Sequence, residues 1–137
     1  MPLDFYEELL NNKRFCESLG RLLLLSGKLE SALKKLLDEN GVKIRTRATL
    51  GELVGACQKN GLTNLDLDDL FTFIVTRRNY LTHNLYPLFN EEIEVTLLPR
   101  EDLCPDDADY YFPKCVNDLI SYIEFTIKHI AVVSNDT

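Results

Sequence analysis

The sequence predicts an all-α protein in which four to five helices form an antiparallel bundle, folded as a single domain over residues 1–137. Three observations predict this fold. Apolar residues recur at helical spacing in three long segments. Asn-Gly pairs, which favour helix ends, close two of the predicted helices. Amphipathic helices cannot bury their apolar faces separately, so they must pack against one another.

One long helix, or two in series, is predicted over about residues 4–39. Asp4 is a candidate N-cap, and the helix can pause at Gly20. Asn40-Gly41 ends the segment because Gly readily adopts the left-handed conformation that follows a helix. The apolar stripe of this segment consists of Leu22, Leu25, Leu29, Leu33 and Leu36.

A short helix follows the basic loop at residues 42–48. Thr49 is its predicted N-cap, with Glu52 at the reciprocal position of a capping box. Asn60-Gly61 is predicted to end it.

A third major helix is predicted from near Asp66 to about Tyr86. Acidic residues in its first turn suit the positive end of the helix dipole. Pro87 cannot easily continue a helix, so the helix should end before it.

A long loop is predicted before the last helix. Residues 91–98 alternate like a strand, but one strand alone is not stable, so we expect an extended segment. The last helix should begin near residues 106–109 and run to about Val133, with Pro113 either in its first turn or resetting its start. Its predicted buried face consists of Val116, Leu119, Ile120, Ile123, Ile127 and Ile130.

Composition narrows the classes of function. The formal net charge is -7, which counts against a general reader of duplex DNA, because phosphate binding depends on Lys and Arg. Basic residues do cluster locally, at residues 43–47 and at Arg77 and Arg78. No apolar run is long enough to span a bilayer and the N-terminus lacks a basic start, so we expect a cytoplasmic protein without a membrane segment. The four cysteines and two histidines do not have zinc-ligand spacing, so no metal site is predicted.

Arg78 projects into the apolar face of the third helix, between Ile74, Leu81 and Leu85 on an ideal helix. A buried guanidinium needs acceptors, because an unpaired buried charge is costly. Three arrangements satisfy it: a carboxylate inside the bundle, a side chain that reaches solvent, or a polar pocket shared with a second subunit.

The string RNYLTH, residues 78–83, resembles the R-x4-6-H signature of the HEPN superfamily (higher eukaryotes and prokaryotes nucleotide-binding domains). Asn79 matches the polar residue common after the Arg. The motif lies late in an apolar helix, after a long first helix and a short second one, which is the HEPN layout over nearly the whole chain. Toxin-type members often carry a Tyr two residues after the His, whereas here Leu85 holds that position and Tyr86 follows it.

The resemblance implies a metal-independent endoribonuclease, without a cofactor, that acts as a homodimer with a shared RNA cleft. His83 would be the general acid or base, and Arg78 would bind the scissile phosphate. Asn79 would orient His83 or bind a phosphate oxygen, and Arg77 and Tyr86 would join Arg78 in contacting RNA. Such a protein would be a toxin or a phage-defence factor.

Two other functions fit the same residues. A catalytically inactive HEPN-like module would dimerise or bind a partner such as an antitoxin, with Arg78 and His83 in structural roles. A nucleotide-binding domain that partners a nucleotidyltransferase would instead have a basic, phosphate-sized pocket.

Overall fold

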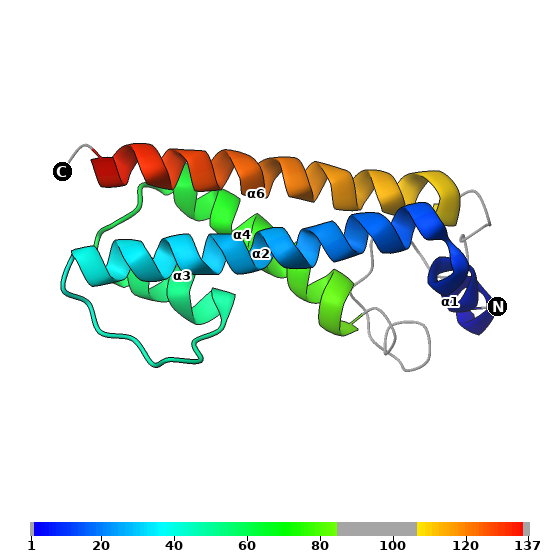
Figure 1. Cartoon of the computed structure of the whole chain (residues 1–137), viewed down its shortest axis with the longest axis horizontal. Coiled ribbons are helices and arrows are strands. Elements are labelled where there is room, and N and C mark those ends of the chain that lie inside the picture. The colour runs from blue at the N-terminus through cyan, green and yellow to red at the C-terminus, as the bar shows by residue number, and fades with distance from the viewer. Residues whose placement is uncertain (1, 85–106, 136–137) are drawn as a thin grey trace. The chain divides into compact units, whose positions relative to one another are not determined.

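The computed structural model describes residues 2–84 and 107–135, and within these ranges every regular element is a helix (Figure 1). The all-α prediction is therefore confirmed, while the predicted extended segment at residues 91–98 lies outside the described residues. In the part that the structure describes, no helix is both long enough and apolar enough to cross a membrane. The elements are α1 (Pro2–Asn11), α2 (Lys13–Glu39), α3 (Leu50–Lys59), α4 (Leu65–Asn79), the π-helical turns η1 (Tyr80–Asn84) and η3 (Asp107–Tyr111), and α6 (Phe112–Asn135).

The described residues fall into two compact units. One unit takes its residues from 1–22 and 76–119, and the other from 23–75 and 120–137. The helices α2, α4 and α6 each contribute residues to both units.

In the first unit, Asn12 separates α1 from α2, where the chain changes direction (Figure 1). The side-chain oxygen of Asn12 accepts a hydrogen bond from the amide of Phe15 at 2.8 Å, as an N-cap does. Of the two predicted arrangements, one long helix or two in series, the structure shows two in series, with the break at Asn12 and α2 continuous through Gly20. Helix α1 also begins at Pro2, two residues before Asp4, and proline suits the first turn of a helix.

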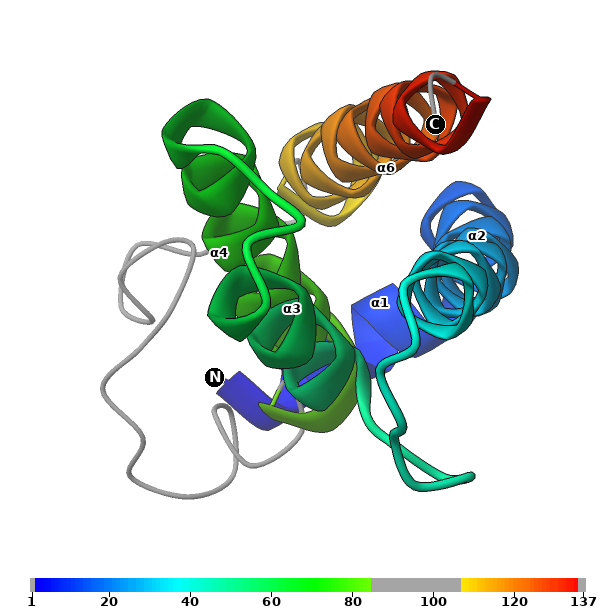
Figure 2. The same ribbon diagram turned by 90° about the vertical axis from the view of Figure 1, so that its left-hand side faces the viewer.

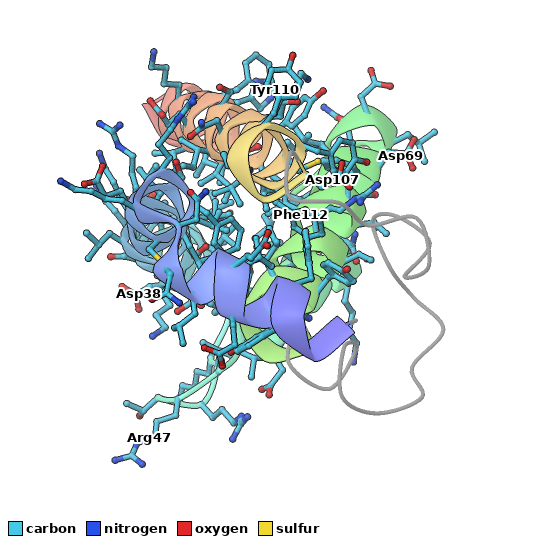
Figure 3. The ribbon with its side chains drawn as sticks, turned by 90° about the vertical axis from the view of Figure 1, so that its right-hand side faces the viewer. Asp38, Arg47, Asp69, Asp107, Tyr110 and Phe112 are labelled. Atoms are coloured by element: carbon cyan, nitrogen blue, oxygen red, sulfur yellow. The ribbon has the colours of Figure 1, made fainter. Side chains whose placement is uncertain are left out.

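Aromatic rings form the core of the first unit. The Phe112 ring is fully buried at the start of α6, with its centroid 5.4 Å from that of Phe5 and 6.3 Å from that of Phe15. The neighbouring Tyr111 ring lies 5.9 Å away, edge to face. Figure 3 shows Phe112 beside α1. Pro113 falls in the first turn of α6, the first of its two predicted positions.

In the second unit, α2, α3, α4 and α6 all contribute buried side chains. Figure 2 shows α3 alongside α4, and a Cβ built on Gly51 would lie 3.8 Å from the Val75 methyl group. Burial raises the pKa of the Cys57 thiol in α3 to about 11, so this cysteine packs as an apolar group. The fully buried apolar residues of this core are Leu29, Leu33, Leu37, Leu50, Leu53, Cys57, Phe71, Ile74 and Ile123.

The ends of α3 follow the predicted capping chemistry. The Thr49 hydroxyl accepts a hydrogen bond from the Glu52 amide at 3.2 Å. Gly61, just beyond the helix, has a φ of 68°, the left-handed conformation that glycine adopts without strain. Gly41, after α2, has a φ of 71° and does the same.

Replacing Thr49 with alanine should lower the free energy of unfolding by about 1 kcal/mol, because the amide of Glu52 loses its capping acceptor. Thr72→Ala is the matched control, since the Thr72 hydroxyl is exposed and bonds only within α4, to the Asp68 carbonyl. Its effect should stay within about 0.5 kcal/mol. Urea denaturation of both variants measures the difference, and equal losses would show that the Thr49 cap does not stabilise α3.

Candidate functional site

The candidate site lies at the end of α4, in the first unit. Arg78 and Asn79 are the last two residues of this helix, and both are half-buried. One terminal nitrogen of Arg78, Nη1, donates a hydrogen bond to Oδ1 of Asn79 at 3.2 Å. The structure therefore brings together two of the predicted site residues, and Asn79 orients the guanidinium.

The side chain of Arg78 leaves α4 on an apolar face of the helix, as predicted. Leu81 follows it one turn later and is buried, with 3% of its surface exposed. The Nε atom of Arg78 is itself buried. The base of the guanidinium is thus enclosed while its Nη1 reaches Asn79, and such packing limits the rotamers that Arg78 can adopt.

The helix changes type immediately after this pair. Residues 80–84, the turn η1, are π-helical, so their hydrogen bonds follow an i→i+5 pattern. The hydroxyl of Thr82 bonds to the Arg78 carbonyl at 2.8 Å, and a threonine that bonds back in this way competes with regular α-helical geometry. Tyr80 and Leu81 are both buried within the turn.

The π-turn alters the predicted geometry of His83. The prediction placed Asn79 and His83 on one stripe because an α-helix turns by about 100° per residue. A π-turn contains more residues, so each residue turns the chain by less. The backbone of His83 belongs to this turn, while its side chain and the whole of Tyr86 lie outside the described residues.

Arg77 belongs to a different set of contacts from Arg78. Burial raises the pKa of Tyr111 and of Cys115, and the nearby charge of Arg77 offsets part of that rise. The Tyr111 hydroxyl donates a hydrogen bond to the Cys115 sulfur. A raised pKa favours the neutral thiol of Cys115, which is a weaker nucleophile than a thiolate.

Sequence reasoning missed Tyr111 and Cys115 as neighbours of Arg77. They lie more than thirty positions further along the chain, and no local pattern links them to α4. The only local signal is their spacing of four, which places them one turn apart. In the structure Arg77 is half-buried and its charge acts on this pair. Its contact with RNA stays a prediction.

The second unit contains two hollows among its described residues. A groove of about 600 Å³ lies between the end of α2 and the loop that follows it. A hollow of about 240 Å³ lies between the start of α4 and α6, with Asp66, Phe125 and His129 in its wall. Within the described ranges, no three His, Cys, Asp or Glu residues gather closely enough to hold a metal ion.

Comparison of the chain with models of known protein families, with curated proteins and with solved structures found no significant match. The HEPN resemblance therefore stays a prediction from residues 78–83 and their place in the chain.

Proposed function

We propose that the protein is a metal-independent endoribonuclease of the HEPN type, with a role as a toxin or in phage defence. The observation that carries the proposal is the Arg78–Asn79 pair at the end of α4, followed five residues after Arg78 by His83 on a π-turn. Single π-turns inside helices occur frequently at functional sites.

The proposed reaction transfers one phosphoryl group of the RNA from a 5′-oxygen to the neighbouring 2′-oxygen. His83 removes the proton from a ribose 2′-hydroxyl, and the 2′-oxygen attacks the adjacent phosphorus. The bond from phosphorus to the 5′-oxygen breaks, and the departing oxygen receives a proton from an imidazolium. The products are a 2′,3′-cyclic phosphate and a 5′-hydroxyl, so no external reactant is consumed.

Arg78 stabilises the transition state in this proposal. A planar guanidinium suits two phosphate oxygens, and its charge offsets the negative charge that develops on them. The hydrogen bond that Arg78 donates to Asn79 and the buried Nε support this role, because a donor that is already oriented needs little rearrangement during the reaction.

We further propose that two copies pair across one cleft. Two chains would place four arginines, Arg77 and Arg78 from each, beside the RNA. Such a local positive charge can attract RNA although the whole chain carries -7.

A second candidate function is an inactive HEPN-like module that binds a protein partner, such as an antitoxin or a nucleotidyltransferase. Exposed aromatic rings in the second unit favour it. The rings of Phe73 and Tyr122 meet edge to face at 5.4 Å and are 39% and 45% exposed, and Phe125 is 59% exposed. Contiguous exposed apolar surface often marks a protein interface.

Incubating the purified protein with total cellular RNA in EDTA separates these functions. The parent should cleave RNA to fragments with 2′,3′-cyclic phosphate ends, and His83→Ala should lower the rate at least about a hundredfold, because a general acid or base is lost. Circular dichroism and gel filtration establish that the variant is folded and has the same oligomeric state.

Two outcomes contradict the proposal. Equal cleavage by the parent and His83→Ala would assign the activity to a contaminant. Absence of cleavage by the parent, over many RNAs and at high protein concentration, would favour the partner-binding module.

A further inference from the structure

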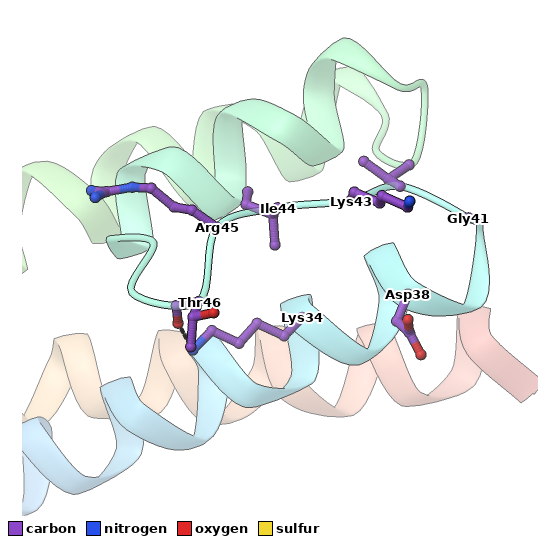
Figure 4. Close-up of a pocket in the computed structure, with 8 residues that line it drawn as sticks. Lys34, Asp38, Gly41, Lys43, Ile44, Arg45 and Thr46 are labelled. Carbon is purple, nitrogen blue, oxygen red and sulfur yellow. Dashed lines mark hydrogen bonds between the residues drawn. The ribbon is translucent and has the colours of Figure 1, made fainter.

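The groove of about 600 Å³ in the second unit has a basic lining (Figure 4). The last turns of α2 form one wall, and the loop from Gly41 to Thr46 forms the other. Lys34 extends from α2 across the groove, and its Nζ donates a hydrogen bond to the Thr46 carbonyl at 3.5 Å. This bond holds an ammonium group at the edge of the groove, with its remaining N–H groups available to a ligand.

The charges along the groove differ in their availability. Arg45 pairs with Glu52 of α3 through two hydrogen bonds, one of 2.6 Å from Nε, so the carboxylate compensates its charge. Lys43 is exposed in the loop, and Arg47 points away from the helices just beyond it (Figure 3). The lining contains three cations, Lys34, Lys43 and Arg45, and one carboxylate, Asp38, so the groove is locally positive.

The ligand that fits this lining is a phosphodiester chain. Lysine binds phosphate as a mobile point charge, without the fixed geometry of an arginine fork. The groove has the volume of a site for a small ligand, so it admits a short run of single strand and excludes a duplex. No aromatic side chain is among the eight residues of its lining, so bases have no ring to stack on.

The hollow of about 240 Å³ between α4 and α6 is unsuited to the same ligand. Its wall contains Asp66 and neither lysine nor arginine. A carboxylate repels phosphate, so the basic groove is the better anion site of the two.

We propose that this groove binds the backbone of single-stranded RNA and anchors the substrate at phosphates other than the scissile one. The inference rests on the proposed ribonuclease function for the identity of the nucleic acid. The contacts position the strand and do not read its sequence, because they reach phosphates and not base edges.

The test uses a fluorescent 2′-O-methyl oligouridine, which cannot be cleaved because its 2′-oxygen is blocked. The double variant Lys34→Gln, Lys43→Gln should raise the Kd at least about tenfold and reduce the slope of log K against log salt by about 1.4, as expected for two lost phosphate contacts. The matched control, Lys28→Gln with Lys59→Gln, removes two exposed charges outside the groove. It should change the Kd by less than about threefold and leave the slope unchanged.

A gain of affinity gives a second readout that misfolding cannot imitate. Asp38→Asn removes the carboxylate of the groove and should tighten binding by about threefold. Equal losses of affinity in the groove variant and its control, or unchanged affinity in Asp38→Asn, would contradict the proposal that RNA binds in the groove. Displacement of the RNA by poly-glutamate as readily as by RNA would also overturn it, in favour of an acidic protein ligand.

The experiments distinguish failure of the groove proposal from failure of the ribonuclease proposal. His83→Ala keeps the groove and should bind the oligonucleotide as the parent does. If the groove variant binds normally while His83→Ala abolishes cleavage, the groove proposal is wrong and the ribonuclease proposal holds. If the groove variant loses binding while the parent cleaves no RNA, the groove is an RNA site on a protein that is not a nuclease.

Discussion

Replacing Phe112 with alanine is expected to lower the free energy of unfolding by about 3–5 kcal/mol, the range for a fully buried phenylalanine. The ring contacts Phe5 of α1 and Phe15 of α2, so its removal leaves a cavity that faces two helices. Since small domains are stable by only about 5–15 kcal/mol, this loss is a large part of the total. Guanidinium denaturation, followed by circular dichroism, measures it.

Phe125→Ala is the matched control, because it removes the same side chain from the same helix at a position that is 59% exposed. Its cost should stay below about 1 kcal/mol. Phe112→Leu keeps an apolar side chain of similar size and should cost less than Phe112→Ala. A loss below about 1 kcal/mol for Phe112→Ala would contradict the assignment of this aromatic cluster as the core of the first unit.

Features set by neighbouring residues were predictable from the sequence. The cap at Thr49 and the turn at Gly61 depend on side chains and backbone within a few positions. The hydrogen bond from Arg78 to Asn79 also joins neighbours in sequence, but it was not predicted. The predicted surroundings of Arg78 were a carboxylate, solvent or a second subunit, and Asn79 was expected to orient His83 or bind a phosphate oxygen.

The break at Asn12 is also local, but the predicted position for a pause was Gly20, with a continuous helix as the alternative. Glycine is the commoner helix interrupter by propensity, whereas an asparagine N-cap acts through one specific hydrogen bond. Gly20 lies within α2, because a single glycine costs only about 1 kcal/mol inside a helix that packs well.

The π-turn and the neighbours of Arg77 were not predictable. Periodicity reasoning assumes a constant rotation per residue, so it cannot detect where η1 begins. The electrostatic interaction of Arg77 with Tyr111 and Cys115 joins distant parts of the chain, and a single sequence carries no signal for it.

Replacing Arg78 with lysine should lower the rate of RNA cleavage by about 10²–10³-fold, the usual cost of removing one oriented donor from a transition state. Lysine keeps the positive charge and most of the apolar stem, but it loses the fork that holds Asn79 and two phosphate oxygens. Arg21→Lys is the matched control, since it makes the same change at an exposed position of α2 outside the proposed site. Its rate should stay near that of the parent.

The division of the loss between kcat and KM distinguishes catalysis from binding. If Arg78 acts on charge that develops only in the transition state, kcat and kcat/KM should fall together, and the Kd for the 2′-O-methyl oligonucleotide should change little. A rise in KM alone would make Arg78 a binding residue that contacts substrate and transition state equally. Parent-like activity in Arg78→Lys would show that a positive charge without the planar guanidinium is sufficient. Orientation of the guanidinium by Asn79 would then not be needed for cleavage. In that case the hydrogen bond between Arg78 and Asn79 would have a structural role, in closing the apolar end of α4 where the π-turn begins.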